Sequence, residues 1–202
     1  MSVGRFLQQA AAGAGGVSVD DVFSTFLYTG NGSTQTITNG IDLDGEGGMV
    51  WIKNRDQADS HILTDTERGA TKILNSDGSV AESTDADTLT AFNSNGFSIG
   101  ADVKVNTNSE DYASWTFRKQ PGFFDVVTYT GTGSARTISH NLGSVPGMII
   151  VKRTDSSGDW QVYHRSNTAS PETDYLVLNS TAVTADSNNR WNDTAPTSSV
   201  FS

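Results

Sequence analysis

The feature that most constrains this chain is an internal repeat with a domain-sized period. Four blocks of the first half return in the second half, each displaced by about a hundred residues. The repeated blocks are YTGNGSTQTI at 28–37 and YTGTGSARTI at 129–138, GMVWIK at 48–53 and GMIIVK at 147–152, LNS at 74–76 and 178–180, and FS at 97–98 and 201–202. Solenoid and propeller repeats are only about 20–50 residues long. The sequence therefore predicts two tandem copies of one domain.

The second copy is predicted to be incomplete. In the first copy, a polar loop and then an alternating run at 113–117 follow the FS block, and this run indicates a core strand that has no equivalent in the second copy. Either the natural polypeptide continues past Ser202, or a partner chain supplies the strand by edge pairing. We favour the first explanation, because a domain without a central strand exposes unpaired edges and apolar surface. The predicted organisation is an N-terminal docking peptide at 1–20, a β-sandwich repeat at 21–121 and a truncated β-sandwich repeat at 122–202.

The charge balance excludes several classes of partner. The 202 residues include 13 basic and 23 acidic side chains, which gives a formal net charge of −10. Binding to nucleic acid requires clustered Lys and Arg, and attachment to an anionic membrane requires a basic patch. The sequence has no run of about 18 apolar residues that would indicate a transmembrane helix, and it has no cysteine for a disulfide framework. We therefore expect protein partners, with no nucleic acid and no membrane insertion.

Short apolar or alternating runs between turn residues predict an all-β fold. The predicted strands include opening strands at 22–28 and 123–129, short Thr-rich strands at 34–38 and 136–139, core strands at 49–52 and 148–151, and alternating strands at 89–92, 160–164 and 175–178. Strands at this spacing favour two tandem antiparallel β-sandwiches of jelly-roll type. Helix is expected only near the N-terminus. Pro121 and Gly122 form the only linker, so the two domains are expected to keep a fixed relation.

Residues 1–20 differ in composition from the rest of the chain. An Ala-rich stretch with helix-forming content is followed by GAGG at 13–16, which would end a helix and act as a hinge. We interpret the segment as a docking peptide, with Phe6 and Leu7 as apolar anchors and Arg5 as a rim contact. The alternative interpretation is a frayed terminus.

Two loops resemble ligand sites, but each lacks a required part. The turn at 30–32 follows a strand, yet the third glycine and the helix of a dinucleotide fingerprint are missing. The acidic loop at 42–46 lacks the ligand spacing and the flanking helices of an EF-hand. This leaves open either a calcium site of another type or a solvated acidic loop.

The three histidines do not indicate a catalytic or metal site. No second His or Cys stands at zinc-ligand spacing from His61, His140 or His164. His164 can be grouped with Asp159 and Ser166 as a triad, but no nucleophile-elbow motif is present. We therefore predict no enzyme activity, no catalytic residues, no metal and no cofactor.

The tryptophans fall into two classes. Trp51, Trp115 and Trp160 lie in strand-like apolar patterns and are predicted to be core residues. Trp191 lies in the polar stretch NNRWND at 188–193 and is predicted to be an exposed contact residue. A surface tryptophan of this kind would suit stacking on a sugar ring.

Several blocks together resemble a known family. GMVWIKNR at 48–55, DTERGA at 65–70 and FNSNGF at 92–97 resemble a repeated domain of bacteriophage virion proteins, chiefly of marine phages, that are usually described as tail fibres or structural proteins. The stretch at 124–165, which includes NLGSVPGM at 141–148, resembles the following module of that family. The resemblance covers all but the N-terminal peptide and carries no catalytic residues.

The resemblance implies a virion structural protein that is assembled in the cytoplasm of a bacterial host. The expected function is the N-terminal attachment region of a tail fibre, in which residues 1–20 dock on the particle and the tandem sandwiches extend toward host-binding parts. A homotrimer is expected by analogy with other fibres. Two alternatives stay open. One is a capsid decoration or head-fibre protein, and the other is a carbohydrate-binding adhesin module in which Trp191 contacts a glycan.

Overall fold

The structure is a computed structural model that describes residues 16–202. The expected docking residues Arg5, Phe6 and Leu7, and the helix around them, lie outside the described residues. The described chain begins with a short 3-10 helix, η1 (Val19–Asp21), which leads into the first strand. None of the helices in this part of the chain is long and apolar enough to cross a membrane.

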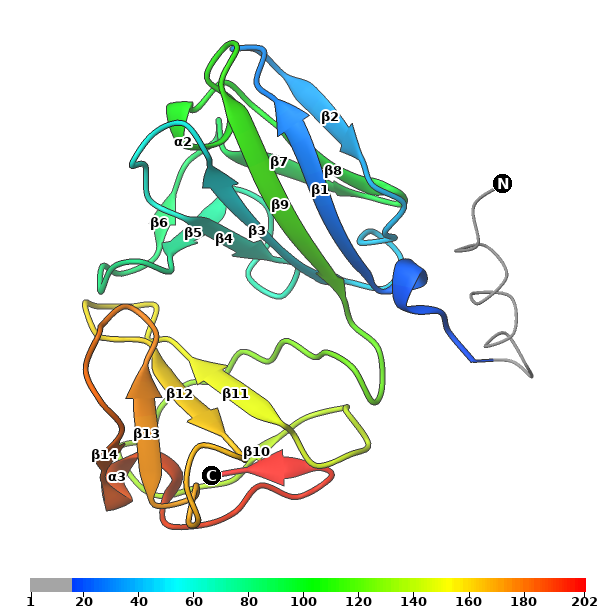
Figure 1. Cartoon of the computed structure of the whole chain (residues 1–202). Coiled ribbons are helices and arrows are strands. Elements are labelled where there is room, and N and C mark those ends of the chain that lie inside the picture. Colours follow the sequence, from blue (N-terminus) through cyan, green and yellow to red (C-terminus); the bar gives the residue numbers. More distant parts are fainter. Residues whose placement is uncertain (1–15) are drawn as a thin grey trace, which may run out of the picture.

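The first repeat is a sandwich of two antiparallel sheets (Figure 1). The larger sheet has six strands in the order β1 (Phe23–Thr29), β9 (Asp111–Arg118), β3 (Gly48–Asn54), β4 (Ile62–Asp65), β5 (Lys72–Asn75) and β6 (Ser83–Thr84). The smaller sheet has three strands in the order β2 (Gln35–Thr38), β8 (Gly96–Ile99) and β7 (Leu89–Asn93).

The core of the first repeat lies between these two sheets. Along β3, Val50 and Ile52 face the core and are each 1% exposed, whereas Trp51 between them faces the outer side of the sheet. The smaller sheet contributes Ile37 and Phe97 to the same hydrophobic cluster. Successive residues of a strand point to opposite faces, so this alternation places one sheet face in the core. The predicted all-β, sandwich-type fold is confirmed.

A closing segment completes the first repeat. We give this name to residues 100–118, which comprise the single-turn helix α2 (Val103–Asn106) and β9. β9 pairs with β1 on one side and with β3 on the other. Tyr112 of β9 stacks on Tyr28 of β1 with ring centroids 5.1 Å apart, and the Tyr28 hydroxyl donates to the Val105 carbonyl at 2.7 Å. The closing segment therefore holds β1 in the sheet.

The second repeat contains counterparts of six strands of the first. β10 (Ile138–Ser139) pairs with β15 (Val200–Phe201), and a second sheet runs in the order β11 (Met148–Val151), β12 (Gln161–His164), β13 (Asp174–Val177) and β14 (Ala185–Asp186). A single-turn helix, α3 (Asn188–Trp191), follows β14. β10 and β15 correspond to β2 and β8, and β11 to β14 correspond to β3 to β6.

The strand registers agree between the repeats. Met148 of β11 lies opposite His164 of β12, as Met49 of β3 lies opposite Asp65 of β4. β10 and β15 likewise reproduce the register of β2 and β8. The repeat in the sequence is therefore also a repeat of strand pairing.

One sequence match is displaced in the structure. The LNS blocks suggest that Leu178 takes the place of Leu74, but Leu176 lies opposite Val162 of β12, as Leu74 lies opposite Leu63 of β4. The displacement is two residues, so it keeps the side chains on the same face of the sheet.

Two expectations are wrong. The predicted opening strand at 123–129 forms no strand. In the first repeat, β1 pairs only with β9, and the described residues of the second repeat contain no counterpart of β9, so this run lacks a pairing partner. Helix is also not confined to the N-terminus, because α2 and α3 are single turns capped by the Asp102 and Ser187 side chains.

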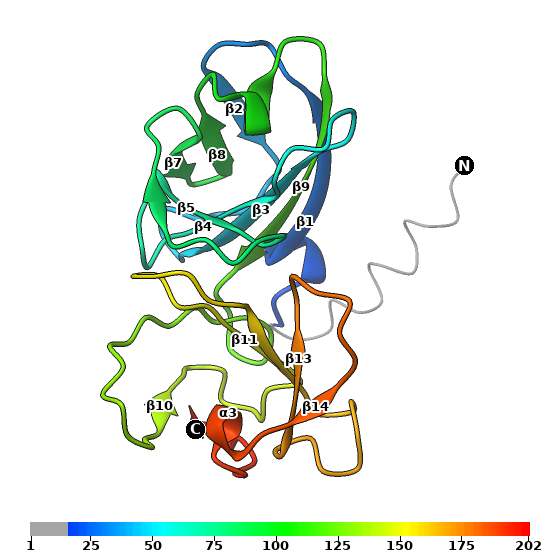
Figure 2. The same ribbon diagram turned by 90° about the vertical axis from the view of Figure 1, so that its left-hand side faces the viewer.

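Trp160 fixes the second repeat against the first. Its ring is 4% exposed and packs with Leu63 and Leu74 on the outer face of the larger sheet. The ring Nε1 donates to the carbonyls of Asn75 and Gly78, at 2.9 and 3.1 Å. Figure 2 shows loops of the second repeat directly below β4 and β5. Trp160 is therefore buried as predicted, but between the repeats rather than within one of them.

Backbone hydrogen bonds reinforce this contact. The Gly158 amide donates to the Ser79 carbonyl at 2.8 Å, and the Glu82 amide donates to the Thr154 carbonyl at 2.9 Å. Such bonds require the two repeats to keep a defined relative position. They agree with the fixed relation that the short linker predicts.

Candidate functional site

The glycine-rich turn at 30–32 and the acidic loop at 42–46 both have structural roles. In the acidic loop, Asp42 Oδ1 accepts from the Gly45 amide at 2.9 Å, which closes a turn. The turn at 30–32 surrounds the fully buried Asn106 of the closing segment, whose Oδ1 accepts from the Asn31 amide at 2.8 Å. Within residues 16–202, no group of three or more His, Asp or Glu side chains is placed to hold a metal ion.

The histidines take part in local hydrogen bonds rather than in a triad. His164 Nδ1 accepts from the backbone amide of Ser166 at 3.3 Å. Asp159 Oδ1 accepts from the Asn179 side chain at 2.9 Å. His140 is 8% exposed, and its Nε2 lies 3.2 Å from the Thr197 carbonyl. These contacts do not relay a proton to a nucleophile.

The predicted exposed contact at Trp191 is wrong. The ring is 3% exposed, its Nε1 donates to the Asp174 carbonyl at 2.9 Å, and it packs edge-on against Tyr163 at 5.9 Å between centroids. Ser187 caps α3 by accepting from the Asn189 amide. This single helical turn directs the tryptophan inward while its polar neighbours stay outside. Trp191 is therefore a core residue of the second repeat.

A block that carries the family resemblance builds part of the scaffold. Arg68 is nearly buried, and its Nε binds Asp65 at 2.6 Å while its Nη1 binds Glu82 at 3.1 Å. Its Nη2 also donates to the Leu63 carbonyl at 3.2 Å. Buried charges require partners of this kind. The DTERGA block thus fixes β4 to the following strands.

The open edge of β11 is the feature of the second repeat best suited to a partner. Among the described strands, β11 pairs only with β12, whereas its counterpart β3 is paired on both sides. Met148 and Ile150 are 56% and 36% exposed, while their counterparts Met49 and Trp51 are partly buried. An unpaired edge presents free N–H and C=O groups that can receive another strand.

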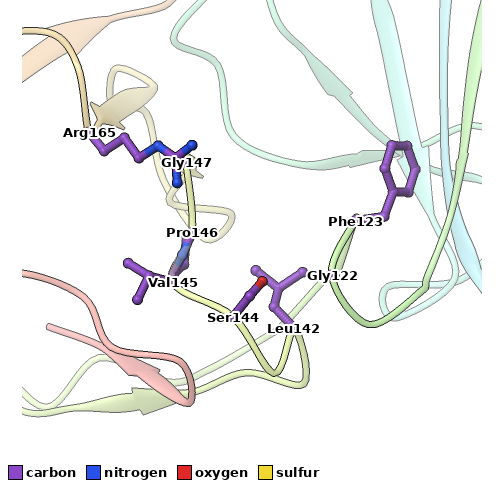
Figure 3. A pocket seen from close by; sticks show the side chains of 8 residues that line it. All are labelled: Gly122, Phe123, Leu142, Ser144, Val145, Pro146, Gly147 and Arg165. Carbon is purple, nitrogen blue, oxygen red and sulfur yellow. The ribbon is translucent and has the colours of Figure 1, made fainter.

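A pocket of about 350 Å³ lies beside the start of β11 (Figure 3). Gly147 and Arg165 lie on one side of it, and Phe123 lies on the other. The remaining lining residues are Gly122, Leu142, Ser144, Val145 and Pro146. Arg165 is the only charged residue in this lining. More of the pocket surface is polar than apolar, and hydrogen-bonding groups beside apolar side chains suit a peptide chain.

Packing shifts the pKa values of two ionisable groups near this edge. Burial raises the pKa of the Tyr129 hydroxyl, and the nearby Arg136 partly opposes this shift. Partial burial lowers the pKa of the Lys152 ammonium just beyond β11, where Nζ donates to the Ser79 carbonyl at 3.4 Å. Both shifts arise chiefly from loss of water, not from a catalytic pair.

Comparison with known proteins gives one match. The family model described as "Domain of unknown function (DUF7483)" matches residues 18–202, which include both repeats. No curated protein matches the chain. No solved structure matches it either.

Proposed function

We propose, for a chain that belongs to the DUF7483 family of unknown function, a structural role in a bacteriophage particle. The protein is the N-terminal attachment region of a tail fibre, which docks on the particle through residues 1–20 and extends toward host-binding parts. It acts through protein contacts and shape, with no enzymatic step. The sequence blocks at 48–55, 65–70 and 92–97 support the link to virion proteins.

The observation that carries the proposal is the rigid contact between tandem β repeats. Trp160 packs with Leu63 and Leu74, and backbone bonds such as Gly158 to Ser79 hold the neighbouring loops. A fibre needs such fixed joints to transmit position from the particle to its far end. Two freely swinging domains would not serve this purpose.

A capsid decoration protein is the second candidate, and the open edge of β11 favours it. Proteins that cover a capsid make repeated lateral contacts, and an unpaired strand edge is one surface for such contacts. Location on the particle separates the two candidates, because a fibre lies on the tail and a decoration protein lies on the head.

The test is antibody labelling of intact phage particles. An antibody raised against residues 21–202 is conjugated to gold, and labelled particles are viewed by electron microscopy. Gold on the tail supports the fibre, gold on the head supports the decoration protein, and unlabelled particles together with absence from purified virions would reject both. Measurement of the native mass of the protein from purified virions tests the proposed homotrimer.

The carbohydrate-binding alternative loses its main support, because Trp191 is buried. A glycan panel still tests it directly. We expect no binding by the 202-residue chain. Specific binding to any glycan would instead favour the adhesin module.

A further inference from the structure

The second repeat keeps both neighbours of a strand that it does not itself contain. In the first repeat, β9 lies between β1 and β3. In the second repeat, the counterpart of β3 is β11, and residues 123–129 correspond to the start of the first repeat up to Tyr28. Within the described residues, no strand pairs with either of them on the β9 side. We call the space between them the open strand position.

Gly48 and Gly147 show what this position is built for. A Cβ on Gly48 would lie 2.0 Å from the Phe117 carbonyl oxygen, so glycine is needed there for β9 to approach. At the counterpart Gly147, a Cβ would meet only Arg165, at 3.8 Å or more. The Gly48 and Gly147 carbonyls make equivalent contacts, because each accepts a backbone bond at 3.0 Å, from the Thr66 and Arg165 amides. The backbone at the two positions differs, since Gly48 has a positive φ of 159° and Gly147 does not. The second repeat thus has the clearance without the strand.

A second pair of glycines gives the same result. A Cβ on Gly30 would lie 2.1 Å from the Thr107 carbonyl oxygen in the closing segment. No heavy atom of the described residues lies within 4 Å of a Cβ placed on the counterpart Gly131. The turn at 30–32 also holds Asn106 of the closing segment. The turn at 131–133 therefore has room for such a segment, with Thr132 in the place of Asn31.

The pocket beside β11 marks one end of the open strand position. In the first repeat, Arg118 at the end of β9 donates its amide to the Val22 carbonyl at 2.8 Å and lies opposite Gly48. The counterparts of Val22 and Gly48 are Phe123 and Gly147, which line opposite sides of the pocket (Figure 3). The pocket therefore lies where the last residue of a β9-type strand would pass.

We propose that the open strand position of the second repeat receives an extended, antiparallel strand with the side-chain pattern of β9. In the first repeat, β8 is connected to β9 by residues 100–110, and β15 occupies the place of β8. A strand grafted behind β15 therefore tests the position at a high effective concentration, which a separate chain lacks. This inference does not depend on the phage role.

The chemistry of the occupant follows from β9. Its inward side chains near β3 are small and hydroxylic, Ser114 and Thr116, and both are fully buried. Tyr112 stacks on Tyr28, and the second repeat presents Tyr129, which is 44% exposed, at the corresponding place. We therefore expect an aromatic residue, then small or hydroxylic residues at alternate positions.

The test is a graft of the first repeat's own segment onto the full chain. The sequence of residues 99–120 is appended directly after Ser202, which corresponds to Ser98. Hydrogen exchange of the β11 amides is then compared between the 202-residue chain and the extended chain. We expect exchange of alternate amides within Met148–Val151 to slow by at least about tenfold, since paired amides are protected. The melting temperature should rise.

Gly147→Ala is the matched control. In the 202-residue chain it should change neither the melting temperature nor the exchange of β11, because a Cβ has room there. In the extended chain it should abolish the protection, as the Gly48 contact predicts. The same 22-residue segment, added as a free peptide, should protect β11 only at high concentration.

Two results would overturn the proposal. They are an extended chain whose β11 exchanges as fast as before, and protection that survives Gly147→Ala. Neither of these results bears on the labelling of phage particles.

Discussion

The two repeats share strands, strand registers and sequence blocks, but the equivalent side chains are well buried only in the first repeat. Tyr28 is 8% exposed, whereas its counterpart Tyr129 is 44% exposed. Val50 of β3 is 1% exposed, whereas the corresponding Ile149 of β11 is only partly buried. The closing segment accounts for this difference, because β9 contacts β1 and β3 at once. One central strand thus decides how well both of its neighbours are buried.

This comparison shows that a repeated residue can be sterically required in one repeat and not in the other. Gly147 and Gly131 have no steric need for glycine in the 202-residue chain, whereas Gly48 and Gly30 do. The sequence alone does not separate these cases, because the letters are the same. Only the packing around each position does so.

The largest effect is expected at Trp160, where the second repeat packs against the first. Trp160→Ala removes a buried ring and two hydrogen bonds, so we expect a loss of about 4 kcal/mol in the free energy of unfolding. The second repeat has an open edge and should become the first target of limited proteolysis. Denaturant unfolding and proteolysis measure the two effects.

Trp160→Phe is the control for this change. It keeps an aromatic ring beside Leu63 and Leu74 but loses the bonds to Asn75 and Gly78, so an intermediate loss of about 2 kcal/mol is expected. A second repeat that resists proteolysis equally in wild type and Trp160→Ala would show that it does not depend on the first.

The next largest effect separates two equivalent glycines. Gly48→Ala forces a Cβ against the Phe117 carbonyl, so we expect a loss of about 3 kcal/mol. Gly147→Ala in the same chain should stay within about 0.5 kcal/mol of wild type. Thermal unfolding of the two variants side by side measures the contrast. Equal losses would mean that Gly147 already has a close neighbour, contrary to the open strand position.

Much of the fold follows from the sequence, because strand patterns are local. The sequence pattern at 48–54 predicts a strand with two different faces, and burial along β3 alternates accordingly. The run at 123–129 has an equally good pattern but forms no strand. A pattern describes side chains, whereas a strand also needs a partner for its backbone, and no local signal reports a partner.

The tryptophans show that burial, too, is hard to predict from the neighbouring sequence. Polar neighbours suggested that Trp191 is exposed, but the single turn of α3 directs it against Tyr163. Trp51 and Trp115 were predicted to be core residues, yet both are only partly buried, and Trp51 faces the outer side of the larger sheet. Burial of Trp160 depends on Leu63 and Leu74 of the other repeat. Composition around a residue does not reveal contacts that the tertiary structure makes.

A smaller effect compares the two equivalent tyrosines at neutral pH. Tyr28→Phe removes the hydrogen bond from the hydroxyl to the Val105 carbonyl, so we expect a loss of about 1.5 kcal/mol. Tyr129→Phe keeps the ring contact with Phe201 and should change stability by less than about 0.5 kcal/mol. Denaturant unfolding at pH 7 measures both. A loss at Tyr129 as large as that at Tyr28 would mean that the second repeat is already closed around its tyrosine.

The smallest effect is the response of Tyr28 to alkaline pH. Burial raises the pKa of its hydroxyl above the value of about 10 in the unfolded chain. Below pH 10 both states keep the proton, but above it the unfolded chain ionises while folded Tyr28 does not, so stability falls as pH rises. Burial also raises the pKa of the adjacent Tyr112, whose contribution is present in wild type and Tyr28→Phe alike. Between pH 9 and 10.5, wild type should therefore lose about 0.8 kcal/mol more than Tyr28→Phe. The same difference for Tyr129→Phe should be smaller, because Arg136 favours the ionised form of that more exposed hydroxyl. Parallel pH curves for wild type and Tyr28→Phe would mean that Tyr28 ionises freely, and the closing segment would then not seal the first repeat.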